Sequence, residues 1–215
     1  MFEDRQLQKT YILLEQKRFG EAEKLLNLLL ANDPNNIEYL TMLSEVKLQQ
    51  DQYDAAEQII NQAISLNPDE SVLYYNKSRI ATQQEEFVKA EVYINQAISM
   101  YPYDAEYFAF AANIKLARKK YQEALEQADK ALEIDAENIL ALNMRSTALL
   151  KLDDKEASFK TIEGALREDP NNAYTHTNYG WGLLEKGDHQ QALVHFKEAL
   201  QQNPNYTYAH KKSIL

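Results

Sequence analysis

Apolar residues recur along this chain with the spacing of an α-helix. Large apolar residues such as Ile60, Ile94 and Phe196 have alanines four positions before and three positions after them. Residues at this spacing lie on one face of a helix. The chain contains only five glycines and five prolines, which favours long helices joined by short connections. We therefore expect an all-α fold.

The proline positions reveal an internal repeat of 34 residues. The prolines are Pro34, Pro68, Pro102, Pro170 and Pro204, and the missing multiple of 34 is Ala136, in the otherwise matching sequence LEIDAEN. Two columns of small residues keep the same step. They are Ala22, Ala56, Ala90, Ala124, Ser158 and Ala192, and Thr10, Ser44, Ser78, Ala112, Ser146 and Gly180. A fixed period of this length indicates one supersecondary unit per repeat.

Each repeat is predicted to fold as a hairpin of two helices. In the first repeat we expect one helix from about Glu3 to Lys17 and another from about Gly20 to Asn32. Small residues let the two backbones approach, and the Asp/Asn-Pro step ends the second helix because proline disfavours helical geometry in the preceding residue. An aromatic column is expected at the turn between the two helices. It holds Phe19, Tyr53, Phe87 and Tyr121, and is broken by Lys155 and His189.

The last repeat, NYGWGLLEKGDHQQALVHFKEALQQNP at 178–204, resembles the tetratricopeptide repeat (TPR) family. The matching positions are Gly180, Leu183, Gly187, Ala192, Phe196, Ala199 and Pro204. The resemblance implies a right-handed α-solenoid of six repeats forming a single domain over residues 3–206. The repeats are 3–36, 37–70, 71–104, 105–138, 139–172 and 173–206. Residues 207–215 are expected to begin a further helix, either a short cap or part of a longer parent protein.

Composition narrows the classes of function. The chain has 23 basic and 33 acidic residues, a net charge of -10 that disfavours binding to nucleic-acid phosphates. It has no cysteine, so disulfides, thiolate nucleophiles and cysteine-based zinc sites are excluded. No apolar run is long enough to span a bilayer, and the polar start does not look like a signal peptide. We expect a cytoplasmic domain without membrane contact, while a membrane segment outside these residues stays open.

The sequence predicts no catalytic residue, cofactor or metal site. The predicted loops are short and contain no glycine-rich phosphate loop, HExxH or GxSxG motif. His189 and His195 are six residues apart, which does not place them on one helical face, so we expect exposed histidines rather than metal ligands.

The family resemblance implies that the first helix of each hairpin lines a concave groove. The exposed side of these helices reads as aromatics, methionines and asparagines, with few charges. The candidate peptide-binding residues are Tyr75, Asn76, Arg79, Phe110, Asn113, Asn143, Met144, Asn178 and Trp181. Aromatics and methionine are favoured in interfaces, and asparagine can pair with the backbone of an extended peptide. The leading hypothesis is a non-enzymatic module that binds a peptide or helix of a partner, apolar to mildly basic.

Two alternatives stay open: a self-associating assembly scaffold, and a regulatory arm of a larger enzyme or membrane protein. A clamp for acidic peptide tails, which some TPR domains use, is not expected. The column that would need lysine holds Asp4, Glu38 and Glu106, which would repel an acidic tail.

Tyr101 and Tyr103 are an unusual pair, because their turn positions are polar in every other repeat. We expect them to cover a neighbouring helix end or to mark a second contact surface. Of the aromatic residues that follow, Phe108 is predicted to lie in the core, Tyr107 to pack between repeats and Phe110 to face the groove.

Overall fold

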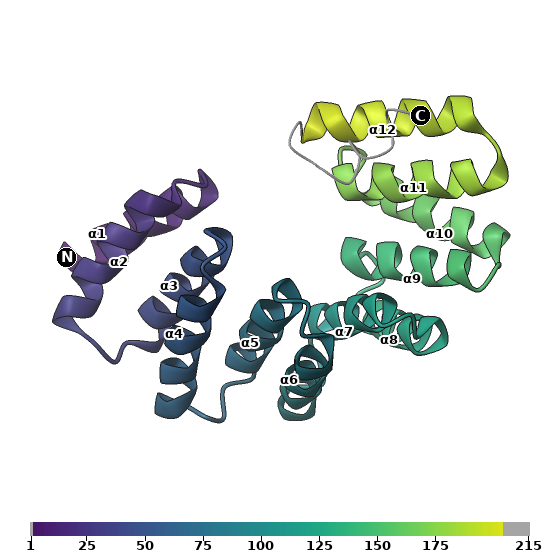
Figure 1. Cartoon of the computed structure of the whole chain (residues 1–215). Helices are drawn as coiled ribbons and strands as arrows, with labels where there is room; N and C mark the ends of the chain where they lie inside the picture. The colour runs from purple at the N-terminus through teal and green to yellow at the C-terminus, as the bar shows by residue number, and fades with distance from the viewer. Residues whose placement is uncertain (1, 204–215) are drawn as a thin grey trace. The chain divides into compact units, whose positions relative to one another are not determined.

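A computed structural model describes residues 2–203 of the chain. Over this range the chain forms twelve α-helices and no strand, with turns of two to four residues between them (Figure 1). The all-α prediction is therefore confirmed. Residues 207–215, where the sequence predicts the start of a further helix, lie outside the described residues.

The helices divide into two compact units, residues Met1–Pro102 and Tyr103–Leu215. The first unit contains α1 (Phe2–Glu15), α2 (Phe19–Asn32), α3 (Ile37–Gln49), α4 (Tyr53–Leu66), α5 (Ser71–Gln83) and α6 (Phe87–Met100). The second contains α7 (Ala105–Ala117), α8 (Tyr121–Ile134), α9 (Ile139–Lys151), α10 (Lys155–Glu168), α11 (Ala173–Lys186) and α12 (His189–Gln202). Within each unit an odd-numbered helix pairs with the even-numbered helix that follows it. Whether the six repeats form a single domain over residues 3–206 stays a prediction.

The helix boundaries repeat with the predicted period of 34 residues. The even-numbered helices begin at Phe19, Tyr53, Phe87, Tyr121, Lys155 and His189. The aromatic column expected at the turn therefore occupies the first residue of the second helix. In the first hairpin the turn is residues 16–18, so the first helix ends two residues before, and the second begins one residue before, the predicted positions.

A left-handed residue recurs at the same position in every hairpin. The six residues are Lys17, Asp51, Glu85, Lys119, Asp153 and Gly187, with φ between 56° and 88°. Glycine adopts this conformation freely, whereas other residues lose roughly 1 kcal/mol there. Five repeats thus carry a backbone cost that the sixth repeat avoids.

The small-residue columns lie where the two helices of a hairpin meet. Ser44 Oγ donates a hydrogen bond to the Ala56 carbonyl at 3.0 Å, and Ser78 Oγ donates to the Ala90 carbonyl at 2.8 Å. Gly180 takes the same position in the last hairpin, where a Cβ atom would come within 2.7 Å of Phe196 Cε1. A small residue at this position is therefore a packing requirement.

The predicted apolar stripe forms the core of the hairpins. Ile60 and Ile94 are completely buried, and Phe196 is 2% exposed. At the starts of four odd-numbered helices a side-chain oxygen caps a backbone N–H. The capping residues are Asn36, Asp104, Asn138 and Asn172, each following the proline position by two residues. These caps satisfy donors that would otherwise lack a partner and set where each helix begins.

Candidate partner-binding site

The second unit contains a cavity of about 420 Å³ between its odd-numbered helices. Its walls come from α7, α9 and α11, each the first helix of its hairpin. The lining residues are Asn113 of α7, Ser146, Thr147, Leu150 and Lys151 of α9, and Tyr174, Asn178, Trp181 and Glu185 of α11. A cavity of this size accommodates one or two large side chains of a bound segment.

Helical spacing places the α11 residues on one wall. Tyr174, Asn178, Trp181 and Glu185 follow one another at intervals of four, three and four residues, so they share a helix face. Phe196 of α12 supports this wall from outside the cavity, because its ring packs edge-on against Trp181 with 5.9 Å between ring centroids. The wall presents two large aromatic rings separated by one amide.

A buried asparagine orients that amide. Asn143 Nδ2 lies 2.8 Å from the Ile139 carbonyl and 2.8 Å from Thr175 Oγ1. The carbonyl can only accept, so this atom of Asn143 must be the amino group. Asn143 Oδ1 then accepts from Asn178 Nδ2 at 3.0 Å. Asn178 is therefore held with its amino group toward Asn143, which leaves its Oδ1 as an acceptor at the cavity wall.

The charges at the cavity cancel one another. Lys151 Nζ lies 3.2 Å from Glu185 Oε1, and both side chains are about four-tenths exposed. The other lining residues are neutral. The lining side chains therefore carry no unbalanced charge.

Three of the predicted contact residues line this cavity: Asn113, Asn178 and Trp181. The prediction of direct contact is wrong for Asn143 and Met144, because both side chains are completely buried. Met144 packs among Ala112, Ala128 and Tyr174, and Asn143 orients Asn178. Both residues therefore act from behind the wall. Phe110 is half-buried on α7 and is not part of the lining, so its contact role stays a prediction.

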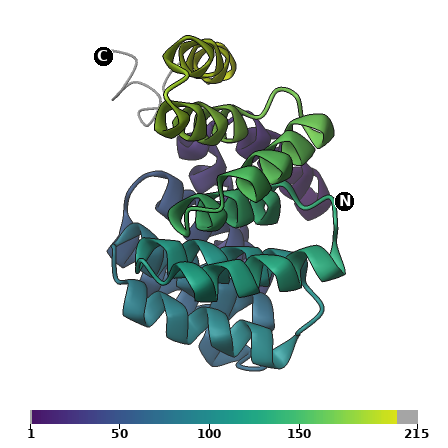
Figure 2. The same ribbon diagram turned by 90° about the vertical axis from the view of Figure 1, so that its right-hand side faces the viewer.

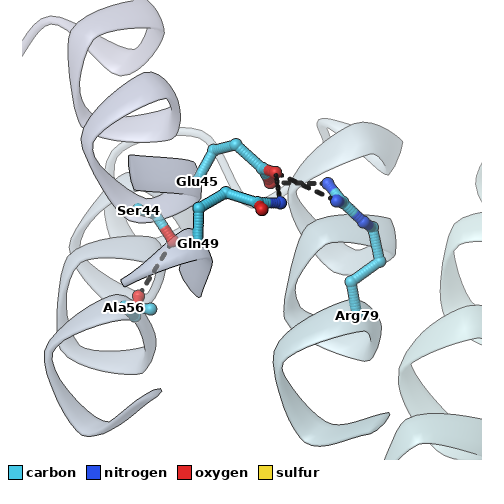
Figure 3. A network of polar contacts seen from close by, with 5 residues as sticks. All are labelled: Ser44, Glu45, Gln49, Ala56 and Arg79. Atoms are coloured by element: carbon cyan, nitrogen blue, oxygen red, sulfur yellow. Dashed lines mark hydrogen bonds and ion pairs between the residues drawn. The ribbon is translucent and has the colours of Figure 1, made fainter. Parts of the chain in front are cut away.

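The remaining candidates, Tyr75, Asn76 and Arg79, lie on α5 of the first unit. Arg79 forms a double ion pair with Glu45 of α3, with Nη1–Oε2 at 2.6 Å and Nη2–Oε1 at 3.0 Å (Figure 3). Gln49 also donates to Glu45 Oε1 at 2.8 Å. Arg79 therefore has a structural role in linking α3 to α5, and partner contact by these three residues stays a prediction.

Six lining residues are absent from the predicted set of contact residues: Ser146, Thr147, Leu150, Lys151, Tyr174 and Glu185. A signal for some of them was present. Thr147 stands in the 34-residue column of Asn113 and Trp181, and Tyr174 and Glu185 share the helix face of Trp181.

The prediction that His189 and His195 are exposed is right for His189 and wrong for His195. His189 is exposed, but His176 is only 9% exposed and His195 is half-buried. Their Nδ1 atoms lie 2.9 Å apart, and His176 Nε2 lies 2.9 Å from the Pro170 carbonyl. Burial lowers the pKa of His195, the charge of His176 lowers it further, and Glu198 opposes the shift. Within residues 2–203 no three metal-ligating side chains come together.

The aromatic residues around Pro102 separate into buried and exposed groups. Tyr107 is 4% and Phe108 is 9% exposed, in agreement with their predicted packing. Tyr101 is 49% exposed and Tyr103 is 72% exposed, and their predicted role at a helix end or contact surface stays a prediction. None of the twelve described helices has the length and apolar character needed to cross a membrane.

Helical hairpins that repeat every 34 residues define a helical-repeat protein of the α-solenoid class. The cavity lies between the first helices of the last three hairpins. Tetratricopeptide repeat family models match residues 47–114 and residues 173–206. Over these two ranges the chain consists of tetratricopeptide repeats, as the resemblance of its last repeat implies. A search of curated protein sequences returned no match.

Solved structures share this fold at low sequence identity. The anaphase-promoting complex structure "APC/C hetero-tetramer Cut9-Hcn1" matches with a TM-score of 0.83 and 18% identity, over 97% of this chain and 41% of that one. Pseudomonas aeruginosa pilF matches with a TM-score of 0.75 and 16% identity, over 97% of this chain and 95% of that one. Yeast Tom70 matches with a TM-score of 0.70 and 20% identity, over 90% of this chain and 42% of that one. This chain thus spans less than half of two of these relatives.

Proposed function

We propose that this chain is a non-enzymatic interaction module that holds a peptide or helical segment of a partner protein in the cavity of its second unit. The observation that carries the proposal is the cavity between α7, α9 and α11, lined by Asn113, Asn178 and Trp181. The TPR fold supports a role in protein–protein interaction in general. The particular groove and its residues are the part to be tested.

The chemistry of the walls suggests what the segment presents. Tyr174, Leu150 and Trp181 offer apolar surface, and burial of a large anchor side chain against such surface commonly contributes more than about 2 kcal/mol to binding. Asn178 Oδ1 is oriented to accept a hydrogen bond, which a backbone N–H beside the anchor would donate. The partner segment therefore carries a large apolar residue in an uncharged or mildly basic stretch.

The same proposal places the chain in the cytoplasm, with a protein partner rather than nucleic acid or a membrane surface. The reasons are its net charge of -10 and its lack of a long apolar run. It assigns no catalytic residue and no cofactor.

The single tryptophan of the chain makes the proposal testable, because Trp181 lies in the cavity wall and reports on it alone. Peptides would be selected from a random phage-displayed library against the whole chain. Each selected peptide would then be titrated while Trp181 emission is recorded. Binding in the cavity should shift the emission to shorter wavelength as the indole loses water contact. Tyr174→Ala and Asn178→Ala should each weaken binding at least about tenfold, equivalent to about 1.4 kcal/mol.

Tyr103→Ala is the matched control, because Tyr103 is an exposed aromatic residue that does not line the cavity. It should leave the affinity within about twofold of the wild type. Peptides that bind Tyr174→Ala and Asn178→Ala as tightly as the wild type would show that the cavity is not the binding site. Circular dichroism of each variant would show that the helices remain folded.

A further inference from the structure

Buried His176 and half-buried His195 stand in columns that are mostly apolar in the other repeats. In repeats two to five the column of His176 holds Leu40, Tyr74, Phe108 and Leu142, and in repeats one to five that of His195 holds Leu25, Ile59, Tyr93, Gln127 and Thr161. A titratable group in such a place departs from the local pattern, and departures of this kind are expected at functional positions.

The hydrogen bonds fix the protons of the neutral pair. The Pro170 carbonyl only accepts, so His176 Nε2 carries a proton and donates to it at 2.9 Å. In the neutral ring His176 Nδ1 then holds a lone pair, and His195 Nδ1 must donate to it across 2.9 Å. One added proton can go to His195 Nε2 without breaking this bond. A second would go to His176 Nδ1 and set two N–H groups against each other.

The neighbouring groups do not provide a counter-charge that would hold two cations. From α11, the Tyr179 ring packs edge-on against His195 with 4.5 Å between centroids. Tyr179 donates to Glu163 of α10 at 3.3 Å, and the carboxylate of Asp169, in the turn before α11, accepts from Asn171 and Asn172. On α12 itself, Glu198 is the acidic group that acts on His195.

We propose that His176 and His195 form a proton-sensitive latch between α11 and α12, which holds α12 in place when both rings are neutral and releases it when both are protonated. In the unfolded hairpin both imidazoles take up protons near pH 6.5. In the folded hairpin the pair cannot hold both protons and keep its hydrogen bond. The contribution of the pair to stability is therefore fully present above about pH 6.5 and is lost as the pH falls below it.

The latch lies on the helix that forms the cavity wall. Figures 1 and 2 show α11 and α12 as antiparallel neighbours. Phe196 of α12 packs against Trp181 and fills the space beside Gly180, so release of α12 removes the support of the indole. Acidification should then weaken partner binding, a consequence that rests on the proposed function of the cavity. The loss of α12 packing at low pH does not depend on that function.

Hydrogen exchange on the whole chain tests the latch without any partner. Protection factors of amides in α11 and α12 would be measured at about pH 7.5 and about pH 5.0. Each proton taken up on opening lowers protection about tenfold per pH unit below about pH 6.5, so a loss of tenfold or more is expected. The internal reference is α3 and α4, which contain no histidine and should change much less.

Two variants separate the latch from general acid effects. The double variant His176→Leu/His195→Gln inserts residues that these columns hold at Leu142 and Gln127, and should lose less than twofold of its protection. His189→Gln removes an exposed histidine of the same helix and should behave as the wild type. An equal pH-dependent loss in the wild type and the double variant would overturn the proposal. If the double variant does not fold, direct titration of His176 and His195 by NMR decides: ordinary pKa values for both would overturn it.

A selected peptide without ionisable side chains tests the link to the cavity. Its affinity for the wild type should fall at least fivefold from about pH 7.5 to about pH 5.0, and that for the double variant should stay constant. If protection falls but the affinity of the wild type does not, the latch exists and does not regulate the cavity. If no peptide binds the cavity at either pH, the proposed function fails, and the exchange result still decides the latch.

Discussion

One column of the repeat shows how the two units differ. It holds Tyr11, Glu45 and Arg79 in the first unit and Asn113, Thr147 and Trp181 in the second. In the first unit Glu45 and Arg79 bind one another across adjacent odd-numbered helices. In the second unit all three residues line a cavity of about 420 Å³. The same backbone position thus bonds to another helix in one unit and lines a cavity in the other.

The two units also differ in their balance of basic and acidic residues. The first unit has nine basic and 16 acidic residues, whereas the second has 14 basic and 17 acidic residues. In the first unit a further acidic residue, Glu38, accepts a hydrogen bond from the Tyr11 hydroxyl at 2.6 Å, and this bond raises the pKa of Tyr11. Odd-numbered helices of the first unit are therefore linked through carboxylates. In the second unit the corresponding link between α9 and α11 includes the neutral pair Asn143 and Asn178.

The largest effect should come from giving the last hairpin the small residue of the first unit. Ser44 and Ser78 fit because their hydroxyls bond to a facing backbone carbonyl, but the Phe196 ring occupies that space at Gly180. Gly180→Ser should lower the free energy of unfolding by about 1–3 kcal/mol, the usual cost of overpacking a core. Urea unfolding followed by Trp181 fluorescence measures it. Gly164→Ala is the control, since its Cβ would meet only the end of Arg167 at 3.7 Å, and should be neutral or stabilising.

A smaller effect on stability is expected from removing the ion pair that links α3 to α5 in the first unit. Glu45→Ala and Arg79→Ala should each lower the free energy of unfolding by about 1 kcal/mol, because their double ion pair is partly shielded from solvent, with both side chains 29% exposed. The double variant should cost less than the sum of the single variants, and the difference should shrink in high salt.

The ion pair Arg18–Glu21, whose side chains are about half exposed, is the control for this double-mutant comparison. Its coupling should be no more than about 0.5 kcal/mol. Equal coupling in the two pairs would mean that the Glu45–Arg79 bond does not hold α3 to α5.

The smallest effect concerns the turn where the sixth repeat alone has glycine. Glu85 adopts φ of 60°, a conformation that Gly187 adopts in the last hairpin without strain. Glu85→Gly should raise the free energy of unfolding by up to about 1 kcal/mol, and Gly187→Ala should lower it by a similar amount. Thermal unfolding of the two variants against the wild type measures both changes. Changes of the same sign would contradict the assignment of strain to this column.

Most of the fold could be predicted, but only part of the site. The period of 34 residues and the helical stripe around Ile60 predict hairpins and their core, because both signals are local. Comparison of equivalent positions in the repeats also finds Asn113, Asn178 and Trp181, which line the cavity. It fails for Met144, because whether a residue reaches the surface depends on the size of its neighbours, and here Ala112 and Ala128 leave space that Met144 fills.

Spacing along the chain likewise could not show the histidine pair. His176 and His195 lie 19 residues apart on different helices, and their rings meet only because the turn after Lys186 folds α12 back onto α11. A prediction that considered spacing along the chain therefore treated His195 as exposed and did not pair it with His176.

The sequence by itself determined the helices, their pairing and the positions where small residues are required, because these follow from spacing within 34 residues. Only the tertiary structure decided which side chains of different helices meet. The Glu45–Arg79 bond, the cavity around Trp181 and the His176–His195 contact each join side chains of different helices. Their existence depends on side-chain volume, hydrogen-bond direction and proton position where those helices meet, and no periodicity along a single helix contains that information.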